Sequence, residues 1–162
     1  MTPESSPSPD QTAPRWLLLA CVAINLYLLG GACLLLAAQY PLLGEVGAAA
    51  LPAFHASLSR RLGVAFILPE FLAFFSVLPL LRWRPAGVSQ AAVWSCVALG
   101  GVYFALTFGW HLPAHRLLAA GDASEPVMRA LLTSHAVRTA SLAMKGGVLL
   151  WMVSAALKRR AA

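Results

Sequence analysis

The stretch WLLLACVAINLYLLGGACLLLAA, residues 16–38, decides the fold of this chain, because its 23 residues include none that is charged at neutral pH. A helix needs about 20 mainly apolar residues to cross the hydrocarbon core of a bilayer. Three further blocks of 19 or 20 residues are nearly as apolar and lie at residues 63–81, 91–110 and 139–157. The sequence therefore predicts four membrane-spanning helices.

The composition of the whole chain also indicates a membrane protein. Hydrophobic residues make up 59% of the 162 residues and charged residues 11%, against about 25% charged residues in soluble domains. The predicted fold is all-α, an integral membrane four-helix bundle with both termini on the same side. Residues 15–160 form its single domain, and residues 1–14, with four prolines and no apolar run, form a disordered N-terminal tail.

The positive charge of the chain is spread along it. The net charge is +6, but the basic residues lie at the ends of the apolar blocks and form no patch, which argues against a nucleic-acid partner. Six basic residues lie close to span ends on the side of the termini and five on the opposite side. By the positive-inside rule we expect cytoplasmic termini, with the lipid bilayer of a bacterial cytoplasmic (inner) membrane as partner.

The histidines are confined to the links on the other side of the membrane. His55 follows the first block, whereas His111, His115 and His135 lie between the third and fourth blocks. These two links, residues 39–62 and 111–138, have 24 and 28 residues. Within them, residues 52–62 and 127–132 are expected to form interfacial helices on the mouth of the bundle. The histidines then form a polar rim.

Three interpretations of this rim stay open. The first is a metal site that uses two or more histidines, with Glu70 as an oxygen ligand. The second is a pocket in which histidines and the arginines Arg61 and Arg138 bind an anionic or phenolic ligand, and the third is hydrogen bonding to backbone or lipid head groups. His111 and His115 have metal-ligand spacing, but Pro113 lies between them and no HExxH or CxxC motif is present, so no metal is assigned.

Two ionisable residues lie deep in predicted spans, where a charge is costly. Glu70 is nine residues beyond Arg61 and Lys145 is seven beyond Arg138, so their depths are about 13 Å and 10 Å at 1.5 Å per residue. We expect a Glu70–Lys145 pair, which either handles protons in a cavity or only ties two helices together. Pro69 is expected to free a backbone carbonyl and to kink the second span. Asn25 is expected to form a hydrogen bond between helices.

Several short motifs resemble a known family. These are Tyr40-Pro41, the segment PAFH at residues 52–55, Arg60-Arg61, the segment LPAHRLLAAGD at residues 112–122, and Arg138-Thr139. They are similar to motifs of small bacterial four-span membrane proteins of unknown function. That group looks related to a broad family that includes the fungal anthrone oxygenases, which oxidise phenolic anthrones to anthraquinones.

The resemblance implies a four-helix bundle with an outward-facing cluster of histidine and arginine. On this basis we expect a site that binds, and in the enzymatic version oxidises, an aromatic or apolar small molecule, either without a cofactor or with a metal. The expected catalytic residues are Glu70, His55 and His135, and the expected substrate-binding residues are Arg61, His111, His115 and Arg138. The alternative is a non-enzymatic accessory or structural protein that associates with itself through the glycine pairs at residues 30–31 and 146–147.

Overall fold

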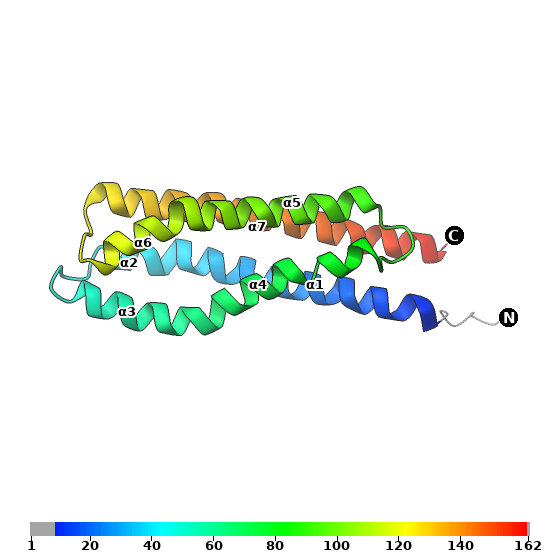
Figure 1. Ribbon diagram of the computed structural model, residues 1–162, viewed down its shortest axis with the longest axis horizontal. Helices are drawn as coiled ribbons and strands as arrows, with labels where there is room; N and C mark the ends of the chain where they lie inside the picture. Colours follow the sequence, from blue (N-terminus) through cyan, green and yellow to red (C-terminus); the bar gives the residue numbers. More distant parts are fainter. Residues whose placement is uncertain (1–8, 162) are drawn as a thin grey trace.

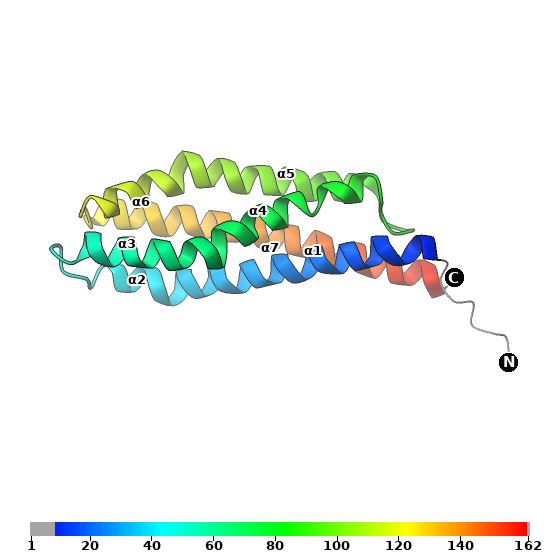
Figure 2. The ribbon, with the colours of Figure 1, turned by 60° about the horizontal axis from the view of Figure 1, so that its bottom comes forward.

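The structure, a computed structural model, describes residues 9–161 and forms an up-and-down bundle of long helices (Figure 1). Helix α1 begins at the same end of the bundle at which helix α7 ends (Figures 1 and 2). The elements in chain order are α1 (Pro9–Leu34), η1 (Leu35–Gln39), α2 (Tyr40–Leu43), α3 (Leu51–Leu62), η2 (Gly63–Ile67), α4 (Leu68–Phe75), η3 (Leu78–Leu81), α5 (Gln90–Leu106), η4 (Thr107–His111), α6 (Leu112–Ala119) and α7 (Glu125–Ala161).

These elements join into four helices that are long and apolar enough to cross a membrane. The helices are Pro14–Leu43, Leu51–Leu81, Gln90–Ala119 and Glu125–Arg159, with 30 to 35 residues each. At 1.5 Å per residue, 30 residues extend about 45 Å, which exceeds the roughly 30 Å of the hydrocarbon core. Large apolar side chains such as those of Val64, Phe75 and Trp151 are exposed on the outside of the bundle. The prediction of an all-α, four-helix membrane bundle is confirmed.

The helices extend farther than the apolar blocks indicated, mainly at the end away from the termini. Only residues 44–50 and 120–124 are loops at that end. Residues 52–62 and 127–132, predicted as interfacial helices on the mouth, are instead the first turns of the second and fourth spans. The first eight residues of the predicted disordered tail lie outside the described residues, and α1 already begins at Pro9.

Three of the spans contain a π-helical turn just before a proline. The turns η1, η2 and η4 each end two residues before a proline, which is Pro41, Pro69 and Pro113 respectively. A helical proline has no N–H and its ring clashes with the carbonyl four residues earlier. That carbonyl belongs to the central residue of each π turn, so the wider turn relieves the clash. At Pro69 the carbonyl is that of Ala65, and it accepts a hydrogen bond from the Tyr27 hydroxyl at 2.9 Å. The predicted free carbonyl is confirmed.

One glycine of each glycine pair lies where two helices pack against each other inside the bundle. A Cβ at Gly31 would overlap the ring of Phe66, whereas a Cβ at Gly30 would meet nothing within 4 Å. A Cβ at Gly146 would lie 3.0 Å from the Asn25 amide nitrogen, whereas Gly147 is open in the same way. One glycine of each pair therefore allows two helices to approach. Asn25 also donates to the Leu142 carbonyl at 3.2 Å, which confirms the predicted hydrogen bond between helices.

The loop between the third and fourth spans is fixed by local hydrogen bonds. Gly121 has a φ of 91°, which favours glycine. Asp122 accepts a hydrogen bond at 2.9 Å from the Ser124 backbone N–H directly before α7. Hydrogen bonding to Ser124 lowers the pKa of the Asp122 carboxyl, because it stabilises the ionised form. This turn leads the chain directly into the long helix that carries His135, Arg138 and Lys145.

Candidate functional site

A cavity of about 330 Å³ lies in the half of the bundle away from the termini, and all four spans contribute to its wall. Much of the wall is apolar, with Leu28, Leu35 and Phe66 among its residues. The π turn η2 contributes apolar residues to the wall, and η4 contributes the polar side chains of Thr107 and His111. The polar residues that line the cavity are Tyr40, His55, Ser59, Glu70, Tyr103, Thr107, His111, His115, Arg116, His135 and Arg138.

The structure brings six of the seven predicted site residues to this cavity. All four histidines, Glu70 and Arg138 line it. The seventh, Arg61, is exposed and is not part of the wall, whereas Arg116 is. Because the helix around residue 61 continues without a break, its arginine points away from the face that carries His55. His55, His111 and His135 are only 4–6% exposed, so the predicted polar rim is in fact the interior of the bundle.

Three histidines form a continuous row, which we call the histidine row: His55, His115 and His111. The Nε2 of His55 lies 2.9 Å from the Nδ1 of His115. The Nε2 of His115 lies 3.1 Å from the Nε2 of His111. Beyond them, the Nδ1 of His111 lies 2.9 Å from the hydroxyl oxygen of Ser134, which donates to the Leu131 carbonyl at 2.9 Å. The row therefore connects α3, α6, η4 and α7.

Tyr40 lies beside the inner half of the histidine row. Its hydroxyl oxygen is 3.3 Å from the Nε2 of His111 and 3.5 Å from the Nε2 of His115. Its ring meets the ring of His135 edge to face, with the centroids 4.7 Å apart. Tyr40 is 3% exposed and belongs to the site.

His135 lies beside this row without a hydrogen bond to it. Its Nε2 lies 2.9 Å from the Ala32 carbonyl and must donate to it, because a carbonyl only accepts. The neutral ring then carries its lone pair on Nδ1, and this buried atom has no hydrogen-bond partner among the described residues. His135 thus adds to the cavity wall a residue whose basic nitrogen has no partner in the described part of the chain.

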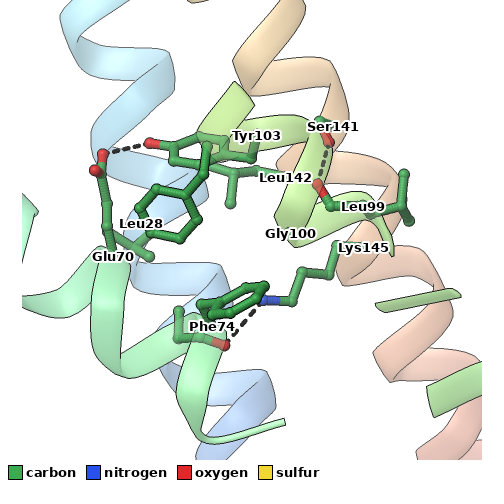
Figure 3. Close-up of a pocket in the computed structure, with 11 residues that line it drawn as sticks. Leu28, Glu70, Phe74, Leu99, Gly100, Tyr103, Ser141, Leu142 and Lys145 are labelled. Carbon is green, nitrogen blue, oxygen red and sulfur yellow. Dashed lines mark hydrogen bonds between the residues drawn. The ribbon is translucent and has the colours of Figure 1, made fainter. Parts of the chain in front are cut away.

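The deep end of the cavity is an ionic network of Arg138, Glu70 and Tyr103. The Nη2 of Arg138 donates to Glu70 Oε1 at 3.1 Å and to the Tyr103 hydroxyl oxygen at 2.6 Å. The Tyr103 hydroxyl donates in turn to the same Glu70 oxygen (Figure 3). The Arg138 guanidinium also lies over the Tyr103 ring, 4.4 Å from its centroid. The Nε of Arg138 has no partner within the described part of the chain.

The predicted Glu70–Lys145 ion pair is wrong. The ion-pair partner of Glu70 is Arg138; the Glu70 side chain is 12% exposed and the Arg138 side chain 5%. Lys145 instead donates from Nζ to the Ala73 carbonyl at 2.9 Å (Figure 3). The depth estimate assumed that Arg61 and Arg138 mark the same membrane edge. Because Arg138 is itself buried at the level of Glu70, Lys145 lies two turns deeper and reaches a residue one turn beyond Glu70.

The arrangement of the rings argues against a single metal centre in the histidine row. His115 offers Nδ1 to His55 and Nε2 to His111, on opposite sides of one ring. The three rings therefore do not converge on one point, as tetrahedral coordination requires. Among the described residues, no group of three or more histidine, cysteine, aspartate or glutamate side chains is arranged to hold a metal ion.

Three residues of the site were not among the predicted site residues: Tyr40, Tyr103 and Ser134. All three are hydroxyl-bearing residues within or next to apolar blocks, where hydroxyl groups are common and carry little signal. Tyr103 had one detectable feature, a phenolic hydroxyl eight residues before His111 and thus deep in the third span. Buried tyrosines need a partner for that hydroxyl.

The partners of Glu70 give the first testable prediction. In a double-mutant cycle in detergent, Glu70→Gln and Arg138→Gln should couple by about 1–3 kcal/mol in the free energy of unfolding, because each leaves the other charge buried. Glu70→Gln and Lys145→Met should add within about 0.5 kcal/mol.

A matched control is available on the surface of α7. Glu125 and Arg129 also form an ion pair, but their side chains are 80% and 74% exposed. A cycle between them should couple by less than about 0.5 kcal/mol. A Glu70–Lys145 coupling as large as that of Glu70 with Arg138 would contradict the structural assignment.

Comparison with known proteins gives no match that could guide the interpretation of the cavity. No protein-family model matches the chain, and no curated protein and no solved structure matches it either. The function is therefore argued from the geometry of the cavity itself.

Proposed function

We propose that this membrane protein binds an aromatic or otherwise apolar small molecule with an acidic hydroxyl group inside the four-helix bundle. The observation that carries the proposal is a cavity of about 330 Å³ with largely apolar walls, two of whose lining residues, His135 and Arg138, each have one buried polar atom without a partner among the described residues. Ligand sites are typically concave and mainly apolar, with a few polar groups that orient the ligand.

The two unpartnered atoms suggest the chemistry of the ligand. His135 Nδ1 is an acceptor and Arg138 Nε is a donor. The residues are three positions apart on α7, a spacing that places side chains next to each other on one helix face. A phenolic or enolic hydroxyl can satisfy both atoms, because its O–H donates to His135 and its oxygen accepts from Arg138. A buried donor or acceptor without a partner lowers stability by about 1–3 kcal/mol, so a ligand that pairs with these two protein atoms is favoured.

The rival proposal, a purely structural protein that associates through its glycine pairs, is supported less well. A scaffold is expected to have a filled bundle and an exposed small-residue face. The bundle instead contains a cavity, and Gly31 and Gly146 pack against Phe66 and Asn25 inside the bundle. Gly30 and Gly147 have open space around them, and self-association through the glycine pairs stays a prediction.

Oxidation of the bound molecule is the second part of the proposal, and it rests on the resemblance to anthrone oxygenases. An anthrone has an acidic C–H beside an aromatic ketone system. Transfer of that proton to His135 Nδ1 would leave an enolate whose oxygen is stabilised by Arg138. The enolate carbon then transfers electrons to O₂ and bonds to it, and the peroxide anion takes the proton back from His135 to give a hydroperoxide. Loss of water gives the quinone, so that one O₂ is consumed and one water released per anthrone.

The binding proposal is tested with 1,8-dihydroxyanthraquinone and protein in nanodiscs. The dissociation constant for this dye should be about tenfold lower than that for anthraquinone without hydroxyls, because only the dye pairs His135 and Arg138. His135→Phe should reduce this preference severalfold. Equilibrium dialysis against empty nanodiscs corrects for partition of the dye into lipid.

A pair of glycine variants locates the bound dye. Gly63 lines the cavity, and a Cβ there would meet nothing within 4 Å, so Gly63→Leu should fill the space and weaken binding about tenfold or more. Gly101 is equally free of neighbours but exposed on the outside, so Gly101→Leu should bind like wild type. Equal binding by the two variants would refute the cavity as the site.

The oxidation proposal is tested separately with 1,8-dihydroxyanthrone in an oxygen electrode. Wild-type protein should consume one O₂ per anthrone, and His135→Phe should lower the rate about 100-fold or more, the usual contribution of a positioned base. Binding without oxygen consumption above that of empty nanodiscs would leave a binding protein and reject the oxygenase.

We further propose that the cavity end of the bundle faces outward across a bacterial cytoplasmic membrane. The support is the small excess of basic residues near the termini. Alkaline phosphatase fused after Ala162 should be inactive and green fluorescent protein at the same position fluorescent. The opposite result would invert the orientation.

A further inference from the structure

We propose that His55, His115, Tyr40 and His111 form a proton relay that connects the mouth of the cavity with its interior. The relay goes beyond ligand binding and gives the proposed site a route by which protons reach or leave a bound molecule without opening the bundle. The hydrogen-bond partners at both ends of the histidine row support it.

The inner end of the row fixes the direction of its hydrogen bonds. The Ser134 hydroxyl has one hydrogen, and the Leu131 carbonyl at 2.9 Å can only accept it. Ser134 therefore accepts from His111 at 2.9 Å, so that the hydrogen of a neutral His111 ring is on Nδ1. The Nε2 of His111 is then a lone-pair acceptor that faces Tyr40 and His115.

The middle of the row follows from this acceptor. The Nε2 of His115 lies 3.1 Å from it, and two lone pairs at that distance would repel, so His115 carries its hydrogen on Nε2. The Tyr40 hydroxyl lies 3.3 Å and 3.5 Å from these two nitrogens. It can accept from His115 while it donates to His111, which gives a second path between the rings.

The outer end completes the order. With its hydrogen on Nε2, His115 accepts at Nδ1, so the His55 Nε2 at 2.9 Å must donate. His55 lies one turn after the start of α3, next to the loop of residues 44–50. The exposed residues Ser59, Arg116 and Ala119 line the same cavity beside His55 and His115 and form its mouth. All donors therefore point inward, from mouth to interior.

In this order a proton can cross the row, because each ring gains a hydrogen at one nitrogen and releases the hydrogen of its other nitrogen to the next ring. A proton from water binds His55 Nδ1 while His55 Nε2 passes its hydrogen to His115 Nδ1. His115 Nε2 then passes its hydrogen to His111 Nε2, directly or through Tyr40. His111 then carries hydrogens on both nitrogens, and because Ser134 holds the hydrogen on Nδ1, the hydrogen on Nε2 is the one that can pass to a bound molecule. An inward transfer leaves the hydrogens of His55 and His115 on Nδ1, and the reverse series, which carries a proton outward, restores the starting order.

The surroundings keep the relay neutral at rest. The titratable and charged groups around the inner rings are Tyr40 from α2, His135 and Arg138 from α7, Tyr103 from α5 and Glu70 from α4, with Arg116 from α6 at the mouth. Glu70 is already paired with Arg138. No free carboxylate among these groups holds a proton on the histidines, so a proton that arrives is passed on.

The hydrogen-bond order is tested on the ligand-free protein in nanodiscs by ¹⁵N NMR of labelled histidine. His111 should carry its hydrogen on Nδ1, and His55, His115 and His135 on Nε2. Ser134→Ala should shift His111 toward the other tautomer, whereas Ser141→Ala should not, because Ser141 bonds the Leu99 carbonyl outside the row. His111 protonated on Nε2 in the wild type would overturn the relay.

The transfer itself is tested by exchange of ring N–H hydrogens with bulk water in the same samples. His55→Gln should slow exchange at His115 and His111 together by about 100-fold, because an amide hydrogen-bonds but is a poor proton carrier. Thr107→Val changes another lining residue outside the row and should leave exchange unaltered. Unchanged exchange in His55→Gln would also overturn the relay.

A dye experiment links the relay to the proposed function and keeps the two separable. With 1,8-dihydroxyanthraquinone at saturation, a stopped-flow pH jump should ionise the bound dye about 100-fold more slowly in His115→Gln than in wild type. Failure of the dye to bind counts against the proposed function, while the NMR and exchange results decide the relay. Equal rates in both proteins would reject the relay.

Discussion

The buried guanidinium of Arg138 is the constraint on which the rest of the structure depends. A cation that is 4% exposed within a membrane bundle is costly unless its charge is compensated. Glu70 from α4 and Tyr103 from α5 supply the compensation, so one contact on α7 fixes the level and rotation of two other spans. Helices α4 and α5 cannot slide past α7 without breaking it. The wall of the cavity is thereby held in register around a charged group.

The prolines provide the space that this ionic network needs. A π turn before Pro69 and another before Pro113 widen two spans next to the cavity, and residues 63–67 and 107–111 supply part of its lining. Bulges of this type cluster at functional sites because they redirect side chains that a regular helix would hold in line. The second of these turns ends at His111 itself. At this position the two ring nitrogens of His111 contact Ser134 on one side and His115 on the other.

The sequence predicted the number of spans and the shared side of the histidines, because both follow from apolar block length. It failed on depth. The apolar blocks mark where lipid contacts the helices, but the helices continue where polar side chains satisfy one another, as His55 and His115 do. The Glu70–Lys145 pair failed for a related reason, because Arg138 was used as a marker of the membrane edge although it is buried. Tyr40, Tyr103 and Ser134 could not be found by pattern, since their role depends on which way each helix is turned.

The location of the polar groups inside helices has a physical consequence for the chemistry of the site. Loop residues at a membrane mouth would be surrounded by water, and each imidazole would exchange protons independently. In the bundle, the rings lie on three membrane-spanning helices, whose backbone hydrogen bonds hold them in place. Hydrogen bonds in such surroundings are stronger and more directional than in water. In the proposed function, a bound hydroxyl would therefore meet fixed partners at His135 and Arg138, and the proposed relay would bring protons to it through groups that are already in line.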